Sequence, residues 1–371
     1  MDAVPLNKEL ESQWESWLAQ GELVLLNEAI QSQLNQMPDH PQLLIWQGRL
    51  AYAQGQVSTA EAIFRQVLKN YTQPSILAEA RKGLKTIEDA EVERRRNRAQ
   101  AIAHTVQGQG FLALLPVDPA HLELHSPIVT KLARILRTDL YTAKFLLPTQ
   151  RLKIIRTGAI AELQAYGEEM RESGIPCMWV ALKHIRDLDI CLVDHFNLLG
   201  LGEIQAVGKD REVVFHMSQV SRRIQGILPT YGGVCEINRK YQVVHKEQIL
   251  DRVRICDLHL PHHNLILRFH DNNYNFGQGI QLDIPRPLSH VLPTIHERWQ
   301  ALMAWFDGFL EFTTVDEDFG KFAEMVMLFP NLVKEVEPRV HLVRPKPQMI
   351  DNCFEIYSAT QFFHDRDRST V

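Results

Sequence analysis

A short motif recurs in the first quarter of the chain at a fixed distance. Ala19-Gln20-Gly21 returns as Ala53-Gln54-Gly55, 34 residues later. A repeat of this length is typical of units made of two short antiparallel helices, which bury their apolar faces only against neighbouring units. Glycine suits the sharp turn inside such a unit because it adopts positive φ angles without steric conflict. The spacing therefore predicts consecutive helical hairpins that turn at Gly21 and Gly55.

The side chains around the second copy also fit a helical hairpin. Gly48 and Ala60 are small enough to let helices approach closely, and Phe64 fills the groove between them. The first copy has larger residues at the equivalent positions, which hold Trp14, Leu26 and Ile30. With this spacing and these residues, the N-terminal quarter resembles the tetratricopeptide-repeat family, as two units followed by a capping helix.

The resemblance implies a role in binding a partner. Repeats of this family present a groove, formed by the first helix of each unit, to a peptide or helix of another protein. Exposed polar side chains on these first helices are therefore expected to contact the partner, because their amide and guanidinium groups can hydrogen-bond a backbone. The candidates are Gln13, Gln20, Gln47, Arg49 and Gln54.

The residue pattern changes after the repeats, which predicts further domains. Apolar residues at helical spacing cover 9–103, where a helical repeat module with its capping helix is expected. Short apolar strands alternate with amphipathic helices over 109–200, as in a small α/β sandwich. Region 201–345 is rich in strand signals and ends in helices, and 346–371 is expected to be a flexible polar tail. The fold class predicted is α+β.

The bulk composition limits the kinds of partner and compartment. The chain has 371 residues and a formal net charge of −5, which disfavours general nucleic-acid binding. Its five cysteines are scattered without a CxxC pair, so free thiols are expected rather than a disulfide framework. No run of about 20 apolar residues is present, and the first residues lack the features of a signal peptide. These features predict a cytoplasmic protein without a membrane span.

Two groups of side chains suggest a metal ion. In the first, Asp257, His259, His262 and His263 lie close together in the sequence. Imidazoles with a carboxylate are good ligands for zinc and similar cations. Alternation along a strand would place Asp257 and His259 on one face, and a turn at Pro261 would bring a later histidine towards them. No established ligand spacing such as HExxH accompanies the group.

The second group is the pair Asp187 and Asp189. Residues two apart on a strand share a face, so the two carboxylates would be able to hold a divalent cation against a phosphate. The neighbouring Arg186 favours ordinary surface pairing instead.

These features predict a non-catalytic adaptor or assembly factor that binds a protein or peptide through its helical hairpins and carries no cofactor. The chain has no dinucleotide-binding glycine fingerprint, GxSxG elbow or recognisable catalytic cysteine context. Two alternatives stay open: a metal-dependent enzyme that uses either group above, and a regulatory protein that senses a small ligand. Beyond the repeats the chain has a general resemblance to an uncharacterised bacterial protein, from which no residue role follows.

Overall fold

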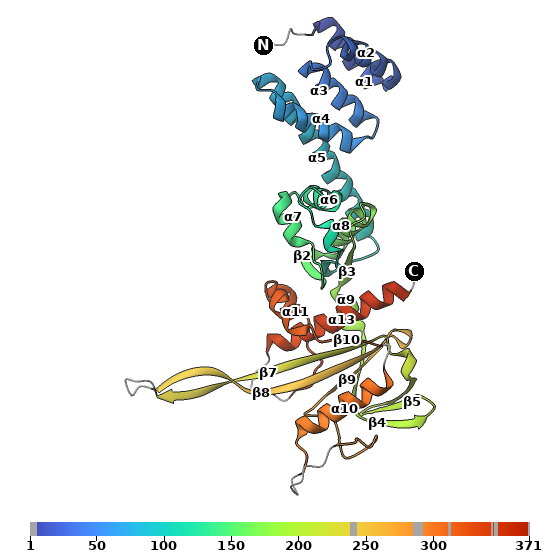
Figure 1. Cartoon of the computed structure of the whole chain (residues 1–371), viewed down its shortest axis with the longest axis vertical. Coiled ribbons are helices and arrows are strands. Elements are labelled where there is room, and N and C mark those ends of the chain that lie inside the picture. The colour runs from blue at the N-terminus through green and yellow to red at the C-terminus, as the bar shows by residue number, and fades with distance from the viewer. Residues whose placement is uncertain are drawn as a thin grey trace. The chain divides into compact units, whose positions relative to one another are not determined.

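The structure is a computed structural model, and the residues that it describes are 6–237, 243–284, 292–310, 313–342, 344 and 348–369. The chain divides into two compact units, Met1–Gln100 and Ala101–Val371. The first unit is helical, and the second combines sheets with helices (Figure 1). The predicted α+β class is therefore confirmed.

The helices of the first unit follow one another with short turns. They are α1 (Lys8–Gln20), α2 (Leu23–Gln36), α3 (Pro41–Ala53), α4 (Val57–Asn70) and most of α5 (Pro74–Ala103). Gly21 and Gly55 lie in the turns after α1 and α3, with φ angles of 77° and 79°. Both predicted turns are confirmed, because these angles belong to the left-handed region that favours glycine. Pro41 and Pro74 each occupy the first helical position, where proline's missing N–H has no partner to lose.

The ring of Phe64 packs where α3, α4 and α5 meet. It is buried, and its tip lies beside glycines of the two flanking helices. A Cβ atom added at Gly48 of α3 would lie 2.7 Å from the ring, and one at Gly83 of α5 would lie 2.5 Å from it. Ala60 is buried in the same cluster. The predicted packing of small residues against an aromatic ring is therefore present, with Gly83 as an additional member.

The first hairpin uses larger side chains to fill its core. Trp14, Leu26 and Ile30 are all fully buried. The Trp14 ring meets the ring of Trp46 edge to face, with 5.5 Å between ring centres. This contact joins α1 to α3, which contributes side chains to the cluster of the first hairpin and to the separate cluster around Phe64.

The second unit contains a small antiparallel sheet of three strands. Its strands, in spatial order, are β2 (Lys153–Ala159), β1 (Gln109–Leu114) and β3 (Cys177–Ala181). The helices packed on one face are α6 (Pro127–Leu136), α7 (Leu140–Leu146) and α8 (Ile160–Glu172). That face buries Leu112 and Leu114, while Phe111 and Val180 on the opposite face belong to another core. The predicted α/β sandwich is therefore present, and both faces of its sheet are covered.

A larger sheet lies in the same unit. Its seven described strands, in spatial order, are β10 (Thr314–Asp316), β7 (Arg222–Ile237), β8 (Val243–Leu260), β9 (Leu265–His270), β4 (Asp189–Gly200), β5 (Glu203–Gly208) and β6 (Glu212–His216). Strand β4 pairs with β9 in parallel and with β5 in antiparallel orientation. The predicted domain boundary at residue 200 is therefore wrong, because β4 bonds to strands from beyond it.

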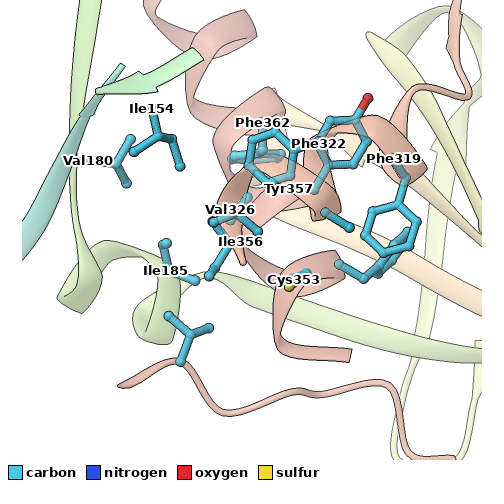
Figure 2. Close-up of a cluster of buried hydrophobic side chains, with 14 of the residues drawn as sticks. Ile154, Val180, Ile185, Phe319, Phe322, Val326, Cys353, Ile356, Tyr357 and Phe362 are labelled. Atoms are coloured by element: carbon cyan, nitrogen blue, oxygen red, sulfur yellow. The ribbon is translucent and has the colours of Figure 1, made fainter. Parts of the chain in front are cut away.

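Helices cover both faces of the larger sheet. They are α9 (Leu182–Asp187), α10 (Ile295–Phe309), α11 (Phe319–Val326), α12 (Pro330–Glu335) and α13 (Met349–Ser369). Helix α10 shares a core with Phe269 and other residues of one face. Helices α11, α12 and α13 share a core with the other face and with the small sheet. In Figure 2, labelled side chains from the small sheet, α9, α11 and α13 gather in this second core.

The C-terminal segment is part of this core. Phe354, Ile356 and Phe362 on α13 are fully buried. The flexible tail predicted for 346–371 is therefore wrong for the described residues of that range, which exclude 346, 347, 370 and 371. The polar residues at the end of the chain suggested solvation, whereas the apolar residues at helical spacing before them decide the packing.

Strands β7 and β8 continue past the other strands as a two-stranded ribbon (Figure 1). Strand β9 pairs with β8 only between Ile255 and Leu260, and β10 pairs with β7 only over three residues. Residues 243–252 of β8 are all exposed. The backbone of the outer ribbon is therefore bonded to one neighbouring strand only, within the part of the chain that the structure describes.

Candidate functional site

Arg49 of α3 is held between an aromatic ring and a carboxylate on the first unit. Its guanidinium carbon lies 4.8 Å from the centre of the Trp46 ring. Its Nη2 atom is 3.1 Å from a carboxylate oxygen of Glu79 on α5, and Gln42 donates to the same oxygen at 3.2 Å. The side chains of Arg49 and Glu79 remain 28% and 32% exposed. These contacts fix the guanidinium plane and leave part of it open to solvent.

The other predicted partner-binding residues do not share this surface. Gln47 is two positions from Arg49, which places it about 200° away around the helix. Gln13 is exposed on α1, where it is the equivalent of Gln47 in the first repeat. Gln20 donates a hydrogen bond within its own helix, and Gln54 caps the end of α3 beside the turn. The five side chains therefore do not line one groove.

Two of the predicted metal ligands lie in the core of the second unit. Asp257 and His259 are fully buried on one face of β8, which is the alternation expected from the sequence. Arg268 of β9 donates two hydrogen bonds to the Asp257 carboxylate, at 2.8 and 2.7 Å. Ser358 of α13 donates to the same carboxylate at 2.5 Å. A guanidinium therefore neutralises Asp257 and takes the place that a metal ion would need.

The predicted metal group is wrong for a geometric reason. His262 and His263 are exposed in the 3-10 turn that follows β8, while Asp257 and His259 are buried. Across the described ranges, no cluster of three or more His, Cys, Asp or Glu side chains is arranged to hold a metal ion. The metal-dependent enzyme hypothesis therefore has no ligand set among these residues.

The pair Asp187 and Asp189 is also separated by the fold. Asp187 is the last residue of α9, and Asp189 is the first residue of β4. Arg211 donates to both carboxylate oxygens of Asp189, each at 2.7 Å. The shared strand face was therefore a wrong prediction, and the pairing arginine is Arg211 rather than Arg186.

The buried carboxylate of Asp257 belongs to a larger charged network. Arg268 also donates to Glu355 of α13 at 2.5 Å, and Arg339 donates to Glu355 at 2.8 Å. Burial opposes the charge of Arg268, but the carboxylates of Asp257 and Glu355 raise its pKa above the usual value. Burial likewise acts to raise the pKa of Glu355, but Arg268 and Arg339 lower it overall. Arg268 and Glu355 therefore stay ionised, and their ion pair attaches α13 to the sheet.

Asp257, His259 and Ser358 are the residue types of a hydrolase triad, but their arrangement differs. The Ser358 hydroxyl donates to Asp257 and lies 3.0 Å from the Nε2 atom of His259, so histidine does not bridge serine and carboxylate. Burial lowers the pKa of His259 well below its usual value, so the ring is neutral near pH 7. All three side chains are fully buried. This network therefore has a structural role, because substrate has no access to the serine.

Two cavities of the second unit differ in how their charges are paired. One of about 650 Å³ is lined by Arg151, Arg222, Asp318 and others. In it, the Arg151 Nε atom is 2.5 Å from Asp318, and the Arg222 Nη1 atom is 3.3 Å from Asp316. A second cavity of about 580 Å³ lies among α8, β3, α9, α13 and residues 104–107. The first cavity has its arginines neutralised by its own carboxylates, whereas the second has basic residues without a lining acid.

Sequence reasoning missed several of these residues. Glu79 has Arg81 and Lys82 close by in sequence but pairs with Arg49 of another helix, and Arg268 is a single charged residue within its strand, so neither sequence neighbourhood indicated the partner. A buried position on a predicted strand was the available signal for Arg268, since a charge there requires a countercharge. The members of the basic cavity come from segments far apart in the sequence. Their proximity could be found only from the fold.

No protein-family model, curated protein sequence or solved structure matches this chain. Of the helices in the described ranges, none has both the length and the hydrophobicity needed to cross a membrane. The function therefore has to be inferred from the residues of this chain.

Proposed function

We propose that the protein is a non-catalytic adaptor or assembly factor that binds a protein or peptide through its N-terminal helical hairpins. The observation that carries the proposal is the linked series of helices α1, α3 and α5. The Trp14–Trp46 contact joins the first two, and the Arg49–Glu79 ion pair joins the last two. Stacked hairpins of this kind leave one face of successive helices open to a partner.

The centre of the proposed contact is Arg49. Arginine and tryptophan are enriched among the residues that dominate binding energy at protein interfaces. Trp46 and Glu79 restrict the guanidinium before a partner arrives, which reduces the entropy lost on binding. Arginine has five N–H donors, so those not used by Glu79 remain for carbonyl or carboxylate oxygens of a partner. The expected partner segment therefore presents such acceptors.

The test uses the full chain as bait, with quantitative capture from an extract of the cells that produce it. Arg49→Ala removes the proposed contact. Arg65→Ala is the matched control, because Arg65 lies on α4 of the same unit, is 62% exposed on its side chain and pairs with Glu61 four residues away. We expect at least one protein to be captured by the unchanged chain and by Arg65→Ala, and to be reduced at least fivefold with Arg49→Ala. Equal recovery with both variants would contradict the assignment of this surface.

The compartment forms part of the proposal. All five cysteines are free thiols, and four of them are buried. Unpaired thiols are typical of a reducing compartment, which supports a cytoplasmic location. The net negative charge supports a protein partner rather than a nucleic acid.

A further inference from the structure

The cavity of about 580 Å³ in the second unit is lined by basic groups and by no acidic one among the described residues. Its permanent cations are Arg171, Lys183 and Arg366, and His104 and His184 also line it. The chain as a whole carries a net charge of −5. A concentration of one sign of charge in a concave site focuses the electric field and attracts ions of opposite sign. The cavity is therefore suited to an anion.

Two of these cations are held in place by aromatic rings. The guanidinium carbon of Arg171 lies 4.3 Å from the centre of the Trp179 ring, and its Nε atom donates to the carbonyl of Cys177 at 3.0 Å. The guanidinium carbon of Arg366 lies 4.8 Å from the Phe363 ring. Stacking of this kind fixes the plane of a guanidinium, and the remaining N–H groups of Arg171 form a fork that matches two oxygens of a phosphate.

Lys183 supplies a cation that is not neutralised within the described chain. It is exposed near the start of α9 and makes no hydrogen bond or ion pair with the described residues. The larger cavity also has an exposed lysine, Lys321, but two carboxylates line it as well, and Asp318 and Asp316 pair there with Arg151 and Arg222. An anion entering the smaller cavity therefore meets charge that the protein has not already balanced.

The remaining wall of the cavity is partly apolar, and Thr105, Gln107 and Gln164 supply polar side chains to it. Val106, Ile160 and Val180 line it together with the basic residues. A volume of about 580 Å³ lies within the usual range for small-molecule sites, which is roughly 300 to 1,000 Å³. A single phosphate group fills only a small part of that volume, so the site has room for an organic group beside the anion.

We propose that this cavity binds a phosphate-bearing organic molecule of up to nucleotide size. Arg171, Lys183 and Arg366 bind the phosphate groups, and the apolar wall contacts the organic part. The site lies in the second unit and is independent of the partner surface around Arg49. It gives the chain a small-molecule binding activity beyond that of an adaptor.

The test measures binding to the full chain by isothermal titration calorimetry at low salt, with inorganic pyrophosphate, ADP and adenosine as probes. We expect pyrophosphate to bind at one site and ADP to bind more tightly than pyrophosphate. Lys183→Met should weaken both about tenfold, which is typical of losing one hydrogen bond to a charged group. Arg171→Lys keeps the charge but removes the planar fork, and should weaken both by a similar factor.

Lys321→Met is the matched control, because Lys321 is an exposed lysine that lines the larger cavity instead. It should leave binding of all three probes unchanged. Absence of pyrophosphate binding, or equal affinity of the unchanged chain and Lys183→Met, would overturn the proposed phosphate site. Adenosine binding as tightly as ADP would overturn the role of the cations. ADP binding no more tightly than pyrophosphate would overturn the role of the apolar wall.

Discussion

The packing of Phe64 against Gly83 predicts how Gly83→Ala changes the stability of the first unit. The direction of that change depends on the side chain at position 64. In Gly83→Ala, the new Cβ would lie 2.5, 2.6 and 2.8 Å from three ring atoms of Phe64. These separations are about 1 Å shorter than an ordinary carbon–carbon contact of about 3.5 Å. The ring has little room to withdraw, because it is buried and its other side faces Gly48 of α3, where a Cβ atom would lie 2.7 Å from it. The substitution therefore requires a shift of α5 or α4.

The size of the stability change caused by Gly83→Ala follows from two opposing effects. Overpacking of a core destabilises by about 1 to 3 kcal/mol. Replacing glycine by alanine in a helix interior stabilises by about 1 kcal/mol, and Gly83 lies well inside α5. We expect a net loss of about 1 kcal/mol in the local stability of the first unit. In a Phe64→Leu background the ring tip is absent, so the same Gly83→Ala substitution should stabilise by roughly 0.5 to 1 kcal/mol.

Native-state hydrogen exchange of peptides from α3, α4 and α5 measures this local free energy without assuming that the whole chain unfolds in one step. A loss of about 1 kcal/mol corresponds to roughly fivefold faster exchange. Four proteins form the double-mutant cycle: the unchanged chain, Gly83→Ala, Phe64→Leu and the double variant. If Gly83→Ala has the same sign and size in both backgrounds, the proposed contact between the ring and the glycine is refuted.

Three further predictions concern the second unit and the thiols. Ser358→Ala should lower its unfolding free energy by about 1 to 3 kcal/mol in urea denaturation, because the substitution leaves buried Asp257 without one donor; an unchanged midpoint would contradict this. Burial, and to a smaller extent the positive charge of Arg268, lowers the pKa of His270 from 6.5 to about 4. Between those pH values the unfolded chain binds a proton that the folded chain does not, so stability should fall by up to about 3 kcal/mol as pH drops from 6.5 to 4. His270→Gln should remove that part of the pH dependence in urea titrations. If the unfolding free energy changes equally with pH in the unchanged chain and in the variant, this role of His270 is contradicted. An aromatic disulfide reagent should modify one thiol per native chain, that of exposed Cys235, since the other four are buried and burial raises the pKa of Cys177 to about 11. Rapid reaction of two or more thiols would disagree with the fold.

The sequence by itself determined the local features of this protein. The 34-residue spacing, the glycines at positions of positive φ and the small residues facing Phe64 depend on backbone sterics and on contacts between neighbouring helices. The alternation that placed Asp257 and His259 on one face of a strand is equally local. Such features could be predicted because the residues that cause them lie within one or two elements of each other.

The tertiary structure decided the partners of these elements. Arg268 of the next strand neutralises Asp257, and the Ser358 hydroxyl, about a hundred residues away, donates a hydrogen bond to it. The carboxylate oxygens are therefore not available as metal ligands. The C-terminal segment becomes a buried helix because its apolar residues meet two sheets and its Glu355 pairs with the buried guanidinium group of Arg268. The basic cavity likewise exists only where α8, α9 and α13 converge. Charge pairing and burial depend on contacts between distant segments, so no local pattern in this chain could specify them.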